Sequence, residues 1–255
     1  NQPRFDAEQG RTCSGGAKIG ELDGKVAIVT GAGRFRGIGH RAAVALARLG
    51  ADVVVTGTGR DPGTFPPDEK SMGWRDIEST AERIRAEGRR ALPLIVDVTK
   101  KGEVRSMVED TLRELGRIDI LVNNAALAGG PDRVPIVELD PDVFRRALAV
   151  KLQGTFLCTQ AVTEVLIRQQ AGGKIVNLSS MVGKTGLPRL LAYTAANFGV
   201  VGMTQSMARE LGPYGINVNC VCPGVVETSR NDIVANGERW KEMAAQTALG
   251  RTGTP

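Results

Sequence analysis

A glycine-rich turn between a short apolar run and an amphipathic helix constrains this chain more than any other feature. The turn reads Thr30-Gly31-Ala32-Gly33-Arg34-Phe35-Arg36-Gly37-Ile38-Gly39, and apolar residues then recur at helical spacing until Gly50. Glycines let a backbone turn tightly and approach a pyrophosphate, while a helix N-terminus supplies N–H groups and a partial positive charge. Alone, the glycines also fit a plain strand-to-helix turn. With a strand before them and a helix after them, they predict a dinucleotide site.

Short apolar runs alternate with helical patterns along the rest of the chain. This alternation is typical of a parallel sheet with crossover helices, so we expect a single α/β domain with a doubly wound, Rossmann-type sheet. A length of 255 residues suits one such domain over residues 22–255, after an N-terminal extension over residues 1–21. The strand candidates are Val26–Thr30, Asp52–Thr56, Ala91–Val96, Ile118–Asn123, Lys174–Leu178 and Asn217–Val221.

Residues 61–75 interrupt this rhythm after the second strand. The segment contains Pro62, Pro66 and Pro67, and connections of this length are uncommon in compact domains and often functional. We expect it near the adenosine end of the dinucleotide site, in a cofactor-binding or subunit-contact role. Further on, the period predicts a helix over Thr194–Leu211, which Gly212-Pro213 ends.

Composition excludes several classes of function. The net charge of +5 comes from scattered basic residues, which favours a solvated surface over nucleic-acid binding. Four cysteines and a single histidine, His40, make a disulfide scaffold and a metal site poor expectations. No apolar run reaches the ~20 residues needed to cross a membrane. The first twenty residues contain no apolar signal-peptide core, so we expect a cytoplasmic enzyme.

Motifs downstream of the turn occur in an order that resembles the classical short-chain dehydrogenase/reductase family. They are Asp97-Val98, Asn123-Asn124-Ala125-Ala126, Ser180 with Tyr193, and Pro223-Gly224-Val225-Val226-Glu227-Thr228. The resemblance covers roughly residues 22–255. It implies an oxidoreductase that transfers a hydride between NAD(P)(H) and a carbonyl or secondary alcohol of a small-molecule substrate, in a homodimer or homotetramer. The family continues beyond Gly250 into a helix and an edge strand, so we expect that strand to be missing here.

The resemblance also implies the residues that bind the cofactor. They are Gly31, Gly33, Arg36, Gly37, Ile38, Gly39, Arg60, Asp97, Val98, Asn124, Ala125, Asn197, Pro223, Gly224, Val226 and Thr228. Gly31 and Gly37 are farther apart than the family's Gly-x-x-x-Gly-x-Gly spacing, so the turn carries two extra residues.

The end of the second strand favours NADP(H) over NAD(H). An acidic residue there would bind the adenosine ribose hydroxyls and repel a 2′-phosphate. The chain instead has Gly57 in that position, with Arg60 shortly after it. Arg36 resembles the basic turn residue of NADPH-preferring relatives, and arginine grips phosphate through several donors. The alternative is that both arginines are merely exposed.

Two polar residues of the family's catalytic tetrad have exchanged places. Tyr193 follows Ser180 at the family's spacing, but Asn197 stands where the family has lysine. Lys151, in Val150-Lys151-Leu152-Gln153-Gly154, stands where the family has asparagine. Free tyrosine titrates near ~10, and a nearby ammonium would help it to ionise near neutral pH. Our hypothesis makes Tyr193 the acid/base, Ser180 the carbonyl-binding donor and Lys151 the ammonium, with Asn197 on the cofactor ribose.

Substrate contacts are expected from Ser180, Leu187, Tyr193 and Trp240, with residues 229–247 as a mobile cover over the substrate. Two other classes of function stay open. One is non-redox chemistry on the same scaffold, such as elimination, hydrolysis or dehalogenation. The other is a catalytically silent nucleotide-binding protein in which the displaced lysine marks lost activity.

Overall fold

The computed structural model describes residues 20–127, 130–229, 231–232 and 237–255. Its six strands are parallel and form one sheet in the order β3-β2-β1-β4-β5-β6, which confirms the predicted doubly wound fold. Among the described residues no strand pairs with the outer side of β6, where the family resemblance places a further strand. The strands are β1 (Val26–Val29), β2 (Asp52–Gly57), β3 (Ala91–Ile95), β4 (Ile120–Asn123), β5 (Gly173–Leu178) and β6 (Ile216–Val221).

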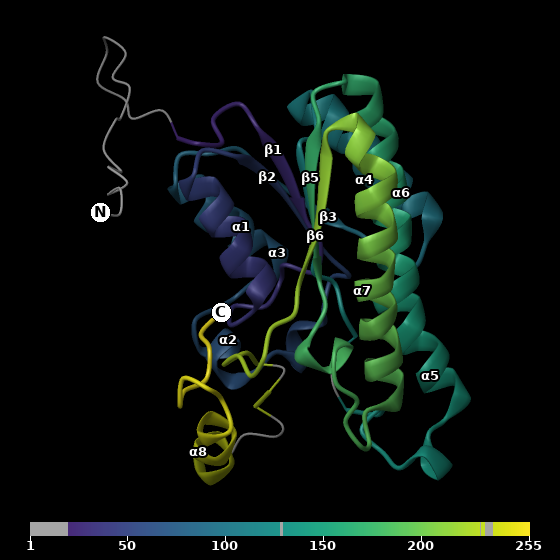
Figure 1. Ribbon diagram of the computed structural model, residues 1–255. Coiled ribbons are helices and arrows are strands. Elements are labelled where there is room, and N and C mark those ends of the chain that lie inside the picture. The colour runs from purple at the N-terminus through teal and green to yellow at the C-terminus, as the bar shows by residue number, and fades with distance from the viewer. Residues whose placement is uncertain (1–19, 128–129, 230, 233–236) are drawn as a thin grey trace, which may run out of the picture.

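Helices cover both faces of the sheet (Figure 1). On one face lie α1 (Ile38–Arg48) and α3 (Ile77–Ala86), and on the other lie α4 (Lys101–Leu115), α6 (Gly154–Gln169) and α7 (Leu191–Leu211). Successive residues of a strand point to opposite faces, so β1 serves both layers. Ile28 joins the apolar cluster under α4 and α6, while Ala27 and Val29 join the cluster under α1 and α3. This double burial explains why the strands are continuous apolar runs.

A π-helical turn, η3 (Ala149–Gln153), interrupts a long helical segment. It lies between α5 (Pro141–Leu148) and α6, which follow one another without a break in the chain. Asp140 starts the segment by accepting the backbone N–H of Asp142 at 2.6 Å. Single π turns inside helices occur frequently at functional sites, because the extra residue redirects a side chain. The residue at the centre of η3 is Lys151.

The segment predicted as a long loop, residues 61–75, contains two short helical turns. These are η1 (Pro62–Thr64) and α2 (Pro67–Ser71), each with a proline at its start, where proline is tolerated. The remaining elements are η2 (Ile136–Glu138), η4 (Met181–Gly183), η5 (Gly212–Tyr214) and α8 (Gly237–Ala245).

Buried amides fix the strands at their carboxyl ends. Asn123, the last residue of β4, donates from Nδ2 to Asn177 Oδ1 on β5 and to Thr159 Oγ1 on α6, both at 2.9 Å. Asn177 in turn donates to Thr204 Oγ1 on α7 at 3.0 Å. Because these groups are buried, each of these bonds costs more to break than an exposed one would. The network therefore holds two strands and two helices in register where ligands of such sheets bind.

Candidate active site

Ser180 and Tyr193 come from adjoining elements at the carboxyl edge of the sheet. Ser180 follows β5 and caps η4, its Oγ accepting the Val182 N–H at 3.4 Å. Tyr193 lies half-buried in the first turn of α7. The neighbouring Ser179 donates from Oγ to the backbone oxygen of Asn197 at 3.0 Å, which holds the turn against α7.

Lys151 is buried beside the same helix. Only 5% of it is exposed, and the π turn that carries it packs against α7. The contact is close because Leu152 lies over Gly199, where an added Cβ would come within 2.7 Å of Leu152 Cδ1. The Lys151 ammonium also lies within electrostatic range of Cys220 on β6. Burial raises the pKa of the Cys220 thiol, and the lysine charge opposes that rise only in part.

Asn197 lies one turn after Tyr193 and faces inward. Its side chain has no exposed surface, and its Nδ2 donates to the Tyr193 backbone oxygen at 2.8 Å. Its Oδ1 is a buried acceptor with no hydrogen-bond partner among the described residues. An unpaired buried acceptor is costly, so this amide fits a donor that arrives with a ligand. Because it is wholly covered, the predicted contact with a ribose requires a neighbouring side chain to move aside.

The glycine-rich turn packs closely against the residues that follow β4. A Cβ added at Gly31 would come within 2.8 Å of Ala125 Cα, and one at Gly39 would overlap Asn124 Nδ2. The helix that follows has no side-chain cap and no acidic residue in its first turn. Its first N–H groups and its positive dipole end are therefore left for an anion. These features fit the pyrophosphate of a dinucleotide.

Asn124 ties this turn to the end of β4. Its Nδ2 donates to the backbone oxygens of Thr30 and Gly31, both at 2.9 Å. Thr30 Oγ1 accepts the backbone N–H groups of Asn124 and Ala125 at 3.0 and 3.1 Å. Asn124 and Ala125 thus lie beside the glycine-rich turn, and the predicted cofactor contact of each stays a prediction.

Asp97 and Val98 follow β3 at the same edge. Asp97 accepts hydrogen bonds from the Thr99 N–H and hydroxyl at 3.0 and 2.8 Å. Burial would raise the pKa of Asp97, but these bonds and the charge of Lys100 hold it below its ordinary value. Val98 packs on the start of α6, where a Cβ at Gly154 would come within 2.6 Å of Val98 Cγ2.

The segment from Pro223 to Thr228 follows β6 and joins the other motifs. Pro223 accepts the Met181 N–H at 2.9 Å, next to Ser180. Just beyond the segment, the Ser229 N–H donates to the Arg36 backbone oxygen of the glycine-rich turn at 3.2 Å. Val226 forms an isolated parallel bridge with Gly253. The segment therefore lies beside both the turn after Ser180 and the glycine-rich turn.

Both arginines that the sequence assigned to a 2′-phosphate are held by carboxylates. Arg36 donates to Asp68 at 2.7 Å and to both carboxylate oxygens of Asp232. These bonds raise the pKa of Arg36, and the same bond from Arg36 lowers that of Asp68. The second arginine, Arg60, donates to Asp76 at 2.8 Å and to Glu69 at 2.9 Å, with its guanidinium 4.4 Å from the Phe65 ring centroid.

The glycine-rich turn and the segment 61–75 pack against each other. Phe35, in the lengthened turn, donates its N–H to Glu69 at 2.9 Å and lies 5.2 Å from the Trp74 ring centroid. Gly33 O accepts from Trp74 Nε1 at 2.6 Å and from Arg60 at 3.0 Å. The extra turn residues and the segment 61–75 therefore form one structural unit.

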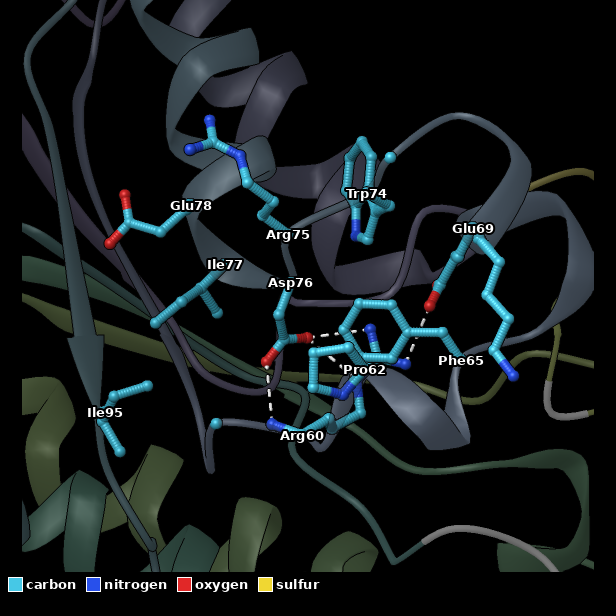
Figure 2. Close-up of a pocket in the computed structure, with 13 residues that line it drawn as sticks. Arg60, Pro62, Phe65, Glu69, Trp74, Arg75, Asp76, Ile77, Glu78 and Ile95 are labelled. Atoms are coloured by element: carbon cyan, nitrogen blue, oxygen red, sulfur yellow. Dashed lines mark hydrogen bonds and ion pairs between the residues drawn. The ribbon is translucent and has the colours of Figure 1, made fainter.

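A cavity of about 570 Å³ lies on this unit rather than beside Tyr193. Figure 2 shows its lining, with Arg60 directed toward Asp76 and Glu69. Of the predicted substrate contacts, Leu187 is exposed in the segment between η4 and α7, and Trp240 is half-buried on α8. Residues 230 and 233–236 of the predicted cover fall outside the described residues.

Sequence reasoning missed Glu69 and Asp76. Neither residue belongs to a recognised motif, and their contacts with Arg60 and the Phe35 N–H form only when the chain folds. The available signal was indirect, namely an acidic residue absent from the end of β2 and acidic residues present in the segment that follows.

The described residues contain no group of three or more potential metal ligands, and none of their helices is long and apolar enough to span a bilayer.

The family model described as short chain dehydrogenase matches residues 25–238. This chain belongs to the short-chain dehydrogenases. Its curated relatives include the short chain dehydrogenase/reductase astE of Aspergillus oryzae, which is 40% identical over 208 residues, 81% of this chain and 73% of that protein. The 2-dehydro-3-deoxy-D-gluconate 5-dehydrogenase of Escherichia coli is 34% identical over 235 residues, 92% of this chain and 85% of that protein.

Solved short-chain dehydrogenases have the same fold. Carveol dehydrogenase from Mycobacterium avium in complex with NAD has a TM-score of 0.80 at 26% identity, covering 92% of this chain and 88% of that one. A putative short-chain alcohol dehydrogenase from Sinorhizobium meliloti has a TM-score of 0.79 at 32% identity, covering 92% and 86%.

Proposed function

We propose that this short-chain dehydrogenase transfers a hydride between a nicotinamide dinucleotide and a carbonyl or secondary alcohol of a small molecule. The proposal is supported by the packing of the elements that carry Ser180 and Tyr193 against each other at the carboxyl edge of the parallel sheet, and by the segment after β6, which links η4 to the glycine-rich turn. Relatives named as dehydrogenases and reductases support the reaction class.

When bound, the dinucleotide supplies or accepts the hydride. The free N–H groups at the start of α1 would hold its pyrophosphate, and the segment from Pro223 to Thr228 would border its nicotinamide. In the reducing direction Ser180 Oγ donates a hydrogen bond to the substrate carbonyl oxygen, where negative charge develops. The Tyr193 hydroxyl gives its proton to that oxygen, and in the oxidising direction it takes the proton back.

The ammonium of Lys151 favours the ionised form of Tyr193 in this proposal. The packing of the π turn on α7 and the near-complete burial of Lys151 support it. A buried ammonium interacts with nearby charges much more strongly than an exposed one, because water screens it less. Asn197 keeps the shape of the helix by bonding the Tyr193 backbone, and its free acceptor is left for a hydroxyl donor.

The preference for NADP(H) stays a prediction, and the contacts of Arg36 and Arg60 do not favour it. Each guanidinium already binds two carboxylates. A cytoplasmic location likewise stays a prediction.

Self-association, as a homodimer or homotetramer, is also part of the proposal. Phe156 on α6 and Phe198 on α7 are 44% and 45% exposed, which is unusual for aromatic side chains on a folded domain. The two helices cover the same face of the sheet (Figure 1), so the exposed rings support a contact between copies on that face.

Coenzyme binding followed by turnover tests the function. NADH and NADPH are titrated into the protein and followed by nicotinamide fluorescence, and oxidised and reduced coenzyme are then supplied with a panel of secondary alcohols, ketones and aldehydes. We expect binding, turnover of at least one panel member, and a loss of about 100-fold or more in Tyr193→Phe with binding kept.

The remaining outcomes separate the alternatives. Binding without turnover over a broad panel would favour a silent nucleotide-binding protein. Absence of binding to either coenzyme would contradict the proposal and leave non-redox chemistry on this scaffold.

A further inference from the structure

Asp76 brings a carboxylate to the place where β2 lacks one. The strand ends in Gly57, and a Cβ added there would lie 3.5 Å from Asp76 Oδ2. A carboxylate on residue 57 itself would occupy nearly the same space. On the other side, a Cβ added at Gly33 of the glycine-rich turn would overlap Asp76 Oδ1. Two glycines from separate elements therefore clear the space that this side chain fills.

The backbone conformation of Asp76 indicates that the surrounding structure holds this residue in place. Its φ of 53° and ψ of −129° lie in a region that residues with a Cβ rarely adopt. Such a conformation is strained, and the surrounding structure must offset the strain. Asp76 precedes α3 without capping it, since its side chain accepts no hydrogen bond from that helix. Helix capping thus does not explain the residue.

The contacts of Asp76 leave one oxygen able to accept further hydrogen bonds. Oδ1 accepts the Arg60 guanidinium at 2.8 Å, whereas Oδ2 has a single long bond from the Arg60 backbone N–H at 3.3 Å. Arg60 holds the carboxylate in one orientation, and the stacked Phe65 ring holds Arg60 (Figure 2). A carboxylate oxygen has two lone pairs, so Oδ2 retains acceptor capacity.

The charges around Asp76 favour hydroxyl groups over a phosphate. Arg60 binds two carboxylates, Asp76 and the wholly buried Glu69, so the trio has a net negative charge. Arg36, in the glycine-rich turn, likewise binds Asp68 and Asp232. A 2′-phosphate placed against Asp76 would meet like charge while Arg36 and Arg60 are both engaged by carboxylates, whereas ribose hydroxyls would be donors to the open oxygen.

We propose that Asp76 accepts hydrogen bonds from the adenosine ribose hydroxyls and makes this enzyme selective for NAD(H) over NADP(H). The carboxylate is supplied by the segment after β2 rather than by the strand itself. This inference rests on the proposed function, because it assumes that the glycine-rich turn binds a dinucleotide. It reverses the cofactor preference that the sequence alone suggested from Gly57 and the two arginines.

Dissociation constants measured by nicotinamide fluorescence test the inference without turnover. The intact protein is expected to bind NADH at least roughly tenfold more tightly than NADPH, since the 2′-phosphate of NADPH would lie against the Asp76 carboxylate. In Asp76→Asn we expect the ratio to fall toward one, with NADPH binding improved. Glu78→Gln is the matched control, because Glu78 lines the same cavity and is exposed, and its ratio should equal that of the parent.

A change in the ligand tests the same hydrogen bond if Asp76→Asn fails to fold. An NADH analogue that lacks the adenosine 2′-hydroxyl should bind the unaltered protein roughly tenfold more weakly than NADH. Three results would overturn the inference and leave the proposed function intact. They are tighter binding of NADPH than of NADH by the intact protein, an unchanged ratio of the two dissociation constants in folded Asp76→Asn, and equal affinity of the intact protein for NADH and for the analogue. Failure to bind either coenzyme would instead remove the proposed function and this inference with it.

Discussion

At the level of single residues, the exchange of Lys151 and Asn197 relative to the family's asparagine and lysine stays a prediction from the sequence. The spacing of Ser180, Tyr193 and Asn197 could be read directly from the sequence, because a helix places residues four apart on one face. The environment of Lys151 could not be predicted in this way. Its burial depends on a π turn and on Leu152 packing over Gly199, and neither leaves a periodic pattern in the sequence.

Replacing Lys151 by methionine removes the ammonium and keeps a long side chain. We expect turnover to fall by about 100-fold, with the acidic limb of the pH–rate profile moved to higher pH, because the ionised tyrosine loses its cation. Steady-state rates across a pH series measure both effects. Lys101→Met, which alters an exposed lysine at the start of α4, should match the parent. An unmoved limb with an undiminished rate would exclude a catalytic role for Lys151.

His40 makes stability sensitive to acid. Burial lowers the pKa of His40 to about 4, helped by the charges of Arg41 and Arg83. Thr80 Oγ1 donates to Ala32 O and so accepts from His40 Nδ1 at 3.1 Å, which fixes the neutral tautomer. Because the unfolded chain takes up this proton near pH 6.5, stability is fully present above that pH and is lost as the pH falls toward 4.

The free energy of unfolding in urea measures this loss. Between pH 7 and pH 5 we expect His40 alone to account for about 2 kcal/mol. His40→Asn keeps a hydrogen-bond donor near the Nδ1 position but does not titrate. It should therefore reduce the difference in the free energy of unfolding between pH 7 and pH 5. A difference that is the same in both proteins would show that other groups cause it.

At the level of elements, the alternation of strands and helices was predictable and the segment after β2 was not. The predicted strand Ala91–Val96 corresponds to β3, and the predicted helix Thr194–Leu211 corresponds to α7, which starts three residues earlier at Leu191. Residues 61–75 have no clear period, because their two turns are too short to repeat one. Their structure comes from contacts with the glycine-rich turn, far away in sequence.

Glu69 is the central link in those contacts. It is wholly buried and binds both the Arg60 guanidinium and the Phe35 N–H. Glu69→Ala should lower the free energy of unfolding by about 3 kcal/mol, because Arg60, only 15% exposed, loses a charge partner. Glu82→Ala, which breaks the exposed ion pair between Arg75 and Glu82 of α3, should lower the free energy of unfolding by less than about 1 kcal/mol. Urea denaturation measures the free energy of unfolding of both variants, and an equal decrease in the two would contradict a structural role for Glu69.

At the level of the whole molecule, the exposed rings of Phe156 and Phe198 predict self-association. Phe198→Lys places a charge on this face, so we expect the mass measured by light scattering to fall to that of a smaller assembly. Val137→Lys is the control, because Val137 is 90% exposed on η2 and its change should leave the mass unaltered. A monomeric parent protein would exclude self-association. An assembly that persists in Phe198→Lys would place the contact between copies on another face.

The fold and the order of the motifs could be predicted because they depend on local periodicity and on spacing along the chain. The partners of Arg36 and Arg60 could not be predicted. Arg36 binds carboxylates from distant segments, and the carboxylates that bind Arg60 follow it in a stretch without a periodic pattern. The central claim, that Lys151 supplies the ammonium for Tyr193, also depends on a contact that local patterns do not reveal. The sequence suggests this role for Lys151, and the packing of η3 on α7 supports it.

A crystal structure of the coenzyme complex tests this claim most directly, through the distance between Lys151 Nζ and Tyr193 Oη. Our account predicts a separation within about 4–6 Å, the range over which an opposite charge stabilises an ionised group. A Lys151 ammonium directed away from Tyr193 and well beyond that range, in a complex with the coenzyme in place, would contradict it.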